Sequence, residues 1–289
     1  MMSIIIPAHN EATVIGRLLA TLLERTSRTE FEIIVVCNGC IDDTADIARK
    51  FGSAVEVIEV SVASKVYALN VGDDSATWFP RFYVDADVMV TPNVLRALAR
   101  RLEVGDVLVC SPVGQYEVSK SSWPVRQYFR VRACLPSAGE GVGGSGVYAL
   151  SEAGRRRFGT FPNVLADDSF VRLQFDPRER ASLKSETSTV YAPRDLRSLL
   201  AVRSRIYHGL LELSSLFPAD RSHRSVENGV ALAKLAAKPQ LWAGIAIYLY
   251  VSLTARARAR TRQRTPGKRA GLGDEIVWQR DQTTRNMTS

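Results

Sequence analysis

The sequence has few cysteines, histidines and lysines. Four cysteines and three histidines in 289 residues are too few for a disulfide-rich scaffold. Only seven of the 38 basic residues are lysine, so arginine supplies most of the net charge of +8. The 46% share of hydrophobic residues excludes a disordered or fibrous chain and leaves one large or two small globular domains.

The first apolar run, residues 3–7, is too short for a signal peptide and has no basic residues before it. We therefore expect most of the protein to face the cytosol. The excess of arginine suits bidentate binding of phosphate groups, and it equally fits a genome of biased base composition. The basic residues concentrate after residue 255 and lack interleaved aromatic side chains, which argues against nucleic acid as a partner.

Residues 239–255 carry no charge but are fewer than the roughly 20 residues that a membrane-spanning helix needs. Arginines follow from Arg256 onward, and Trp242, Tyr248 and Tyr250 are suited to lipid headgroups. We expect this segment to contact the inner face of the cell membrane. The alternative is a buried core helix followed by a solvated basic tail. The polar tail from residue 265 has one apolar stretch, residues 276–278, that is suited to docking on the domain.

Apolar runs alternate with helical patterns along the first half of the chain, which predicts a doubly wound, mostly parallel sheet. The predicted strands are residues 3–7, 31–37, 55–60, 82–84, 107–110, 147–150 and 187–191. The predicted helices are residues 14–23, 42–51, 65–73, 92–101, 123–135, 151–158, 168–175, 196–213 and 226–238. Between residues 111 and 122 the pattern predicts only a polar connection.

Two carboxylates, Asp85 and Asp87, follow the strand at 82–84. Open α/β sheets bind ligands at the carboxyl ends of their strands. Paired acids there suit Mg²⁺ or Mn²⁺, which take oxygen ligands and keep substrate phosphates in their other positions. Solvated aspartates in a plain turn are the alternative, because Asp-x-Asp alone is a weak signal.

Three further segments reach the same edge of the predicted sheet. They are Pro7-Ala8-His9-Asn10-Glu11, Cys37-Asn38-Gly39-Cys40-Ile41-Asp42-Asp43, and the helix that starts at Lys65 and carries Ala68-Leu69-Asn70. Together with Asp85-Ala86-Asp87, this set resembles the inverting glycosyltransferases of family 2. The resemblance implies a GT-A fold, with a Rossmann-like, mostly parallel sheet flanked by helices and followed by a C-terminal helical extension.

By this resemblance the donor is a nucleotide-diphospho-sugar, and a UDP-sugar is favoured. Its nucleoside would lie among Pro7, Ala8, Asn10, Glu11 and Asn38, with Lys65 near the base or phosphates, and with Asp85 and Asp87 at the ribose and the metal. Cys37-Asn38 stands where the family often has two aspartates, so the usual acidic contact to the base is absent.

The resemblance also implies a catalytic base and an acceptor loop. Asp167-Asp168 matches the family's acidic pair, in which the second acid, here Asp168, is the base. N-capping of the following helix is the alternative for this pair. The loop Gly143-Gly144-Ser145-Gly146 would admit the acceptor, unless it is a plain turn.

Arg203 and Arg205 would hold the diphosphate, or else are surface charges on a helix. Of the Gln-x-x-Arg-Trp motif of processive relatives only Arg205 is matched, because Val202 and Ile206 replace the other two residues. We therefore expect a non-processive enzyme.

The rival interpretations come from other classes of protein. Cys37-x-x-Cys40 suggests a redox motif, but a redox protein has no use for Asp85, Asp87 and Lys65. A nucleotidyltransferase would carry a glycine-rich basic loop near the first strand, which this sequence lacks. A non-catalytic relative that binds a sugar nucleotide stays open as an alternative.

We therefore predict three parts: a GT-A domain at residues 1–215, a helical membrane-proximal extension at 216–264, and a polar tail at 265–289. The predicted reaction moves a sugar to a hydroxyl of a cell-surface glycan, a glycolipid or a small molecule.

Overall fold

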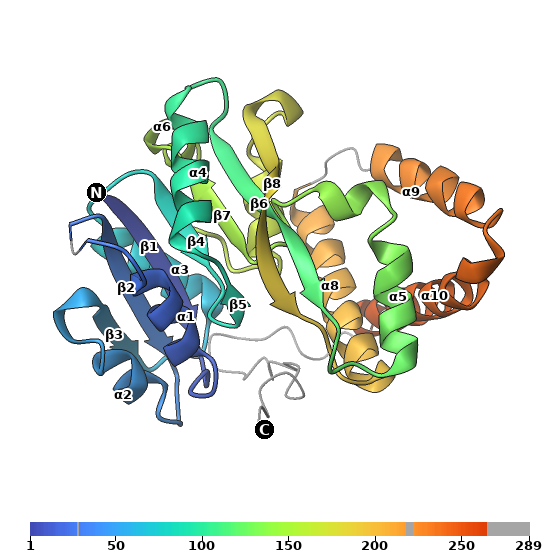
Figure 1. Cartoon of the computed structure of the whole chain (residues 1–289), viewed down its shortest axis with the longest axis horizontal. Helices are drawn as coiled ribbons and strands as arrows, with labels where there is room; N and C mark the ends of the chain where they lie inside the picture. The colour runs from blue at the N-terminus through green and yellow to red at the C-terminus, as the bar shows by residue number, and fades with distance from the viewer. Residues whose placement is uncertain (28, 218–221, 265–289) are drawn as a thin grey trace. The chain divides into compact units, whose positions relative to one another are not determined.

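The computed structural model describes residues 1–27, 29–217 and 222–264. The predicted polar tail, with its docking stretch at 276–278, lies outside these residues. The described part divides into two units (Figure 1). The sheet unit comprises Met1–Gln115, Glu140–Asn163 and Asp167–Val190, and the helical unit comprises Tyr116–Gly139, Val164–Ala166 and the chain from Tyr191 onward.

An eight-stranded sheet with the order β3-β2-β1-β4-β7-β6-β8-β5 organises the first unit. Its strands are β1 (Met2–Ala8), β2 (Phe31–Asn38), β3 (Glu56–Val60), β4 (Arg81–Val84), β5 (Val88–Met89), β6 (Val109–Glu117), β7 (Val147–Leu150) and β8 (Arg180–Tyr191). The strands β3, β2, β1 and β4 are parallel, whereas β7 runs antiparallel to β4 and β6. The α/β prediction is confirmed, with β3, β2, β1 and β4 forming its parallel part.

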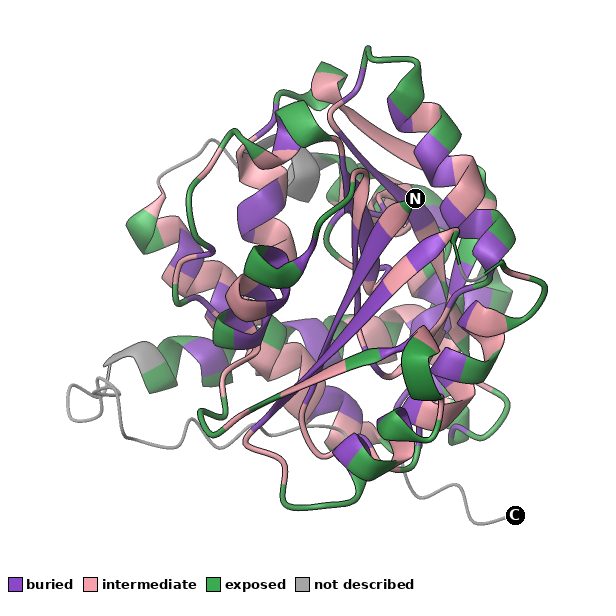
Figure 2. Cartoon of the chain, turned by 90° about the vertical axis from the view of Figure 1, so that its left-hand side faces the viewer, coloured by how far each residue is buried: buried purple, intermediate pink, exposed green. Residues whose placement is uncertain are grey.

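Helices flank the sheet on both faces. They are α1 (Ile15–Leu23), α2 (Thr44–Arg49), α3 (Lys65–Ser75), α4 (Pro92–Glu103), α6 (Glu152–Arg155) and α7 (Asp167–Leu173). Alternate residues of a strand point to opposite faces, so Ile4 and Ile6 join the core with α1 while Ile5 packs against Gly72 of α3. The strands β1, β2 and β4 are mostly buried, and the helices expose their outer sides (Figure 2).

Two strands are longer than predicted. β6 continues to Glu117 through the stretch that we predicted as a polar connection, and β8 begins at Arg180 rather than at residue 187. Both extensions are half-exposed and therefore carry polar residues, which hides them from a search for apolar runs. The two-residue strand β5, paired with β8, is too short to leave a pattern.

The helical unit contains α5 (Trp123–Arg132), α8 (Leu196–Leu216), α9 (Ser222–Leu235) and α10 (Trp242–Arg264). Its core joins Val125 and Tyr128 of α5, Leu199 and Leu200 of α8, and Val251 of α10. The charge-free segment forms, from Trp242 onward, one helix with the arginines that follow it. No helix in the described part is both long enough and apolar enough to cross a membrane.

Candidate active site

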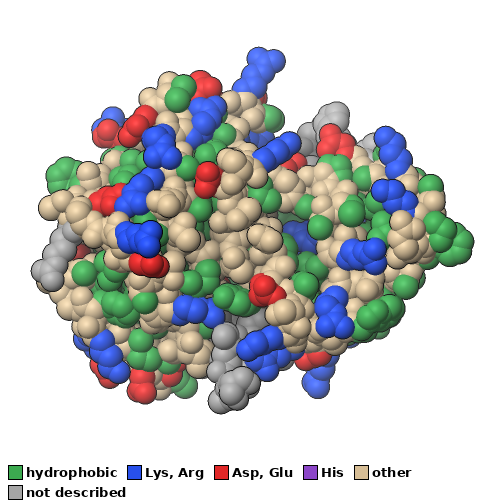
Figure 3. Space-filling view, viewed as in Figure 1, with side chains coloured by type: hydrophobic (Ala, Val, Ile, Leu, Met, Phe, Trp, Pro, Cys, Tyr) green, Lys and Arg blue, Asp and Glu red, His purple; other side chains and the backbone are tan. Residues whose placement is uncertain are grey.

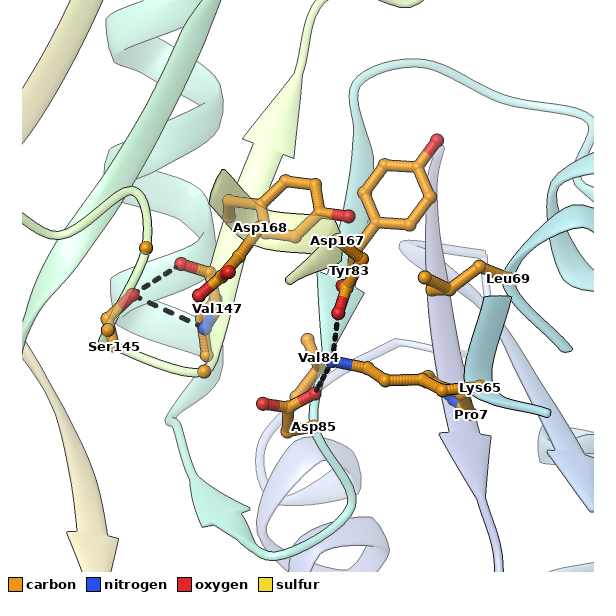
Figure 4. Close-up of a pocket in the computed structure, with 14 residues that line it drawn as sticks. Pro7, Lys65, Leu69, Tyr83, Val84, Asp85, Ser145, Val147, Asp167 and Asp168 are labelled. Carbon is orange, nitrogen blue, oxygen red and sulfur yellow. Dashed lines mark hydrogen bonds and ion pairs between the residues drawn. The ribbon is translucent and has the colours of Figure 1, made fainter. Parts of the chain in front are cut away.

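Five segments that are distant in sequence line one recess in the sheet unit (Figure 4). The predicted site residues that line it are Pro7, Lys65, Asp85, Gly143, Gly144, Ser145, Gly146, Asp167 and Asp168. The end of β4 supplies Asp85, the start of α3 supplies Lys65, and the start of α7 supplies the aspartate pair. The recess thus lies at the carboxyl end of β4, the edge at which the paired carboxylates were expected to bind a ligand.

Lys65 joins two carboxylates across this recess (Figure 4). Its Nζ lies 2.7 Å from Asp85 Oδ1 and 3.0 Å from Asp167 Oδ1. Burial alone would lower the pKa of Lys65, but the facing charges of Asp167 and Asp85 outweigh burial and raise it. The ammonium group therefore stays charged and balances part of the negative charge of the recess.

The aspartate pair opens α7, and both of its carboxyl groups have raised pKa values. Burial raises the pKa of Asp167 to about 6, with Lys65 opposing the shift and Asp168 and Asp85 adding to it. Burial also raises the pKa of Asp168, again against the charge of Lys65. Asp168 accepts a hydrogen bond from the Ser169 backbone N–H at 2.6 Å, which fixes its carboxylate at the start of the helix.

The loop at residues 143–146 approaches the carboxylates with backbone rather than side chains. Gly146 has φ of +67°, and a Cβ atom there would lie 2.4 Å from Val88 Cγ2 and 3.3 Å from Asp85 Oδ2. Only glycine fits such a position without strain. Ser145 bonds through its hydroxyl to the backbone of Gly141 and Val147, so this side chain stabilises the loop itself.

Tyr148 lines the recess, although the sequence analysis assigned it only to a strand. Its ring stacks on that of Tyr83 with the ring centroids 4.8 Å apart. The Tyr148 hydroxyl is buried and has no hydrogen-bond partner among the described residues, whereas the Tyr83 hydroxyl donates to Asp73 Oδ1 at 2.5 Å. A tyrosine in a short apolar strand looks like a core residue, so the sequence held no signal for this one.

The predicted nucleoside residues after β1 and β2 interlock, but apart from Pro7 they do not line the recess. Asn38 donates from Nδ2 to the Ala8 carbonyl at 2.8 Å, and the Ile41 backbone N–H donates to Asn10 Oδ1 at 2.8 Å. Glu11 is buried and donates its backbone N–H to Thr44 Oγ1 at 2.7 Å. These bonds hold both loops in one arrangement beside the recess.

The two cysteines of the second loop form a hydrogen-bonded pair. The Cys37 thiol donates to Cys40, which raises the pKa of Cys37 and lowers that of Cys40 to about 7. Asn10 donates its backbone N–H to Cys40 Sγ at 3.4 Å. Cys40 is therefore part of the network that links the first two loops.

Asp87 does not line the recess, although Asp85 does. Its side chain is half-buried in the turn between β4 and β5, where the Val88 backbone N–H donates to the Asp85 carbonyl at 3.2 Å. Within the described residues, no three His, Cys, Asp or Glu side chains are grouped so as to hold a metal ion. A divalent cation here would need oxygen ligands from its substrate as well.

Arg203 and Arg205 belong to α8 of the helical unit. Arg203 packs over the ring of Tyr207, with its Cζ atom 5.1 Å from the ring centroid. Arg205 is half-buried on the same helix. The contact of Arg203 with Tyr207 is thus made within the helical unit, and the assignment of both arginines to the diphosphate stays a prediction.

The fold is that of the GT-A glycosyltransferases, and two solved structures share it. One is the mannosyltransferase PcManGT from Pyrobaculum calidifontis in complex with GDP-Man and Mn²⁺, with 21% identity over 90% of this chain and 82% of that chain at a TM-score of 0.61. The other is glucosyl-3-phosphoglycerate synthase from Mycobacterium tuberculosis in complex with Mn²⁺, UDP-Glc and phosphoglyceric acid. It has 19% identity over 77% of this chain and 81% of that chain at a TM-score of 0.55. At these identities the likeness is one of fold.

The family follows from the sequence itself. The model described as glycosyl transferase family 2 matches residues 3–157, and the chain therefore belongs to that family. Glycosyltransferase AglE of Haloferax volcanii is 31% identical over 90 residues, which span 29% of this chain and 30% of AglE. The predictions of the family and of a glycosyltransferase are confirmed. The family match ends before the aspartate pair.

Proposed function

We propose that this protein transfers a sugar from a nucleotide-diphospho-sugar to a hydroxyl acceptor with inversion at the sugar carbon, one sugar at a time. One observation carries the proposal: Lys65 and the carboxylates of Asp85, Asp167 and Asp168 converge at the carboxyl edge of the parallel strands. Such a displacement needs a carboxylate that accepts a proton from the acceptor and a cation that faces the departing diphosphate.

For the donor, we propose that the nucleoside lies over the interlocked loops of Asn10 and Asn38 and that the diphosphate faces Lys65. The two solved relatives bind GDP-Man and UDP-Glc, so the fold accepts more than one base. Thermal-shift measurements with UDP-, GDP- and dTDP-sugars test the base, since a ligand of the native state raises the midpoint of unfolding. A UDP-sugar is expected to give the largest shift, and the absence of any shift would contradict donor binding.

We propose Mg²⁺ or Mn²⁺ as cofactor, held by Asp85 and Asp87 together with the donor phosphates. The residues fit a cation: Asp85 and Asp167 already share one positive charge, and Asp167 Oδ2 is buried with no hydrogen-bond partner in the described part. The bound metal would neutralise charge on the leaving diphosphate. Asp87→Ala should abolish Mn²⁺-dependent donor binding, measured by calorimetry, while Asp74→Ala, at an exposed position on α3, should leave it intact.

Asp168 is the proposed base. Its carboxylate would take the proton of the acceptor hydroxyl, whose oxygen attacks the sugar carbon from the side opposite the diphosphate and so inverts its configuration. The raised pKa of Asp168 favours proton acceptance. Asp168→Asn should lower turnover by about 10²-fold or more while donor affinity stays near normal.

The same measurement on Asp167→Asn decides the register within the pair. An inactive Asp167→Asn beside an active Asp168→Asn would make Asp167 the base. Parallel loss of donor binding in both variants would make the pair structural. A wild-type protein that binds a sugar nucleotide yet never transfers its sugar would be a non-catalytic relative, and release of pyrophosphate from a nucleoside triphosphate would indicate a nucleotidyltransferase.

We further propose that α10 rests on an anionic membrane surface at the cytoplasmic side of the cell membrane. Its exposed apolar side chains are Trp242, Leu249, Tyr250 and Leu253, and exposed arginines follow from Arg256. Such a helix suits the boundary between headgroups and acyl chains. Leu249→Asp with Leu253→Asp should abolish sedimentation with anionic vesicles, whereas Val230→Asp, exposed on α9, should not. Equal sedimentation of both variants would contradict the contact.

A further inference from the structure

A group of arginines and tyrosines in the helical unit does not line the recess. It consists of Tyr116, Tyr128, Arg132, Arg203, Tyr207 and Arg256, contributed by β6, α5, α8 and α10, and we call it the arginine–tyrosine cluster. It lies entirely within the helical unit.

Arg203 is the inner cation of the cluster. Its Nη2 donates to the Tyr207 hydroxyl across 3.4 Å, and its Nε is buried with no acceptor among the described residues. Burial opposes its charge, and the surrounding phenols of Tyr128 and Tyr207 raise its pKa. Arg203 therefore remains a cation whose donors are only partly satisfied.

Two further guanidinium groups flank it. Arg256 of α10 packs over the Tyr207 ring, with its Cζ atom 5.1 Å from the ring centroid. Arg132 of α5 packs over Tyr116 at 5.2 Å and donates to the Tyr116 hydroxyl at 3.3 Å. Within residues 1–27, 29–217 and 222–264, none of these three arginines forms an ion pair with a carboxylate.

Charge balance is the physical reason to expect a ligand. A buried cation without a counterion is costly, and buried arginines are normally paired. The Tyr128 hydroxyl is also buried without a hydrogen-bond partner in the described part, so it is a further neutral donor. Arg256 is exposed while Arg132, Arg203 and Tyr207 are half-buried, so an anion can enter from solvent.

We propose that the arginine–tyrosine cluster binds the phosphate group of a small molecule or of a membrane lipid. A phosphate dianion matches several guanidinium forks at once, since each fork can donate two parallel hydrogen bonds. Arg132, Arg203 and Arg256 supply three such forks within the helical unit.

Titration of the full chain with inorganic phosphate, followed by calorimetry and by the NMR signals of the arginine Nε–H groups, tests the site. Arg256→Gln, at an exposed position, should weaken phosphate binding by about tenfold or more. Arg197→Gln removes the same charge from an exposed position of α8 and should leave the affinity unchanged. Equal affinity in the wild type and Arg256→Gln, or equal loss in Arg197→Gln, would overturn the site.

Arg203 needs a test that separates binding from folding. Arg203→Lys keeps the charge but lacks the planar fork, so it should bind phosphate more weakly than the wild type while retaining the wild-type unfolding midpoint. In the wild-type spectrum, the Arg203 Nε–H signal should shift on addition of phosphate. An unmoved Arg203 signal at saturating phosphate would overturn its role.

The source of the phosphate is decided by competition. Displacement of phosphate from the cluster by UDP would assign it to the donor and overturn a separate phosphate site. For a small-molecule source, 3-phosphoglycerate should displace phosphate from the wild type, whereas glycerate should not. For a lipid source, vesicles of phosphatidylcholine with phosphatidic acid should bind the wild type more tightly than Arg256→Gln, and vesicles of phosphatidylcholine alone should not distinguish the two. Failure of both sources to compete with phosphate would overturn the proposal. Phosphate binding needs no sugar transfer, so it remains measurable even if the proposed function fails.

Discussion

Replacing Lys65 by methionine should make the stability of the protein strongly dependent on pH. Lys65 is the cation between Asp85 and Asp167, and the Asp167 side chain is only 6% exposed. Removing one partner of a buried ion pair costs about 3–5 kcal/mol because the other charge is left uncompensated. The side chains of Lys65 and Asp85 are 24% and 36% exposed, so solvent screening reduces the loss of unfolding free energy to about 3 kcal/mol at pH 8.

The sign of the pH dependence follows from Asp167. Its pKa rises from 3.8 to about 6 in the folded protein, so the stability linked to its protonation is present at low pH and is lost as pH rises through about 6. Without Lys65, the main charge that lowers the pKa of Asp167 is gone, so this pKa rises further. The loss of stability then continues to higher pH. At pH 5 a protonated Asp167 needs no counterion, and the cost should fall to about 1 kcal/mol.

Urea unfolding of Lys65→Met at pH 5 and pH 8 measures both values. Lys50→Met removes the same charge from an exposed position and should change little at either pH. Adding Asp167→Asn to Lys65→Met should restore most of the stability at pH 8, because the orphaned charge is removed. An equal loss at both pH values, or no recovery in the double variant, would refute the reasoning.

Three further outcomes are expected. Gly146→Ala should destabilise the protein by more than about 1 kcal/mol in thermal unfolding, because its φ of +67° and the contact with Val88 leave no room for a Cβ atom. Iodoacetamide should alkylate Cys40 with a rate that rises through about pH 7, while Cys110, whose pKa burial raises to about 12, stays unreactive in the folded protein. Asp73→Asn should cost about 3 kcal/mol in urea unfolding, because two arginines, Arg81 and Arg155, pair with this buried carboxylate.

The surface of the sheet unit shows why composition alone points to no single partner. On the face in Figure 3, basic and acidic side chains are interspersed over this unit rather than gathered into one field. Pairs such as Arg101 with Asp106 and Arg157 with Glu179 balance one another locally. The net charge of +8 is thus a property of the whole chain.

The elements that lie next to a turn signal in sequence were predicted closely. β1 and β2 are nearly uninterrupted apolar runs, and α4 begins at Pro92 as predicted. The prediction was weakest where a segment is half-exposed, as in β6 beyond residue 110, because there neither an apolar run nor a helical period is present.

The sequence by itself determined the alternation of strands and helices and the placing of Asp85 and Lys65 at strand and helix ends, because both follow from local periodicity and turn chemistry. Only the tertiary structure decided that Asp167 meets Lys65 and that the Tyr148 hydroxyl reaches the recess without a partner. The contact of Lys65 with Asp167 joins residues about a hundred positions apart in the chain. The ionisation of such side chains depends on burial, which no local pattern encodes.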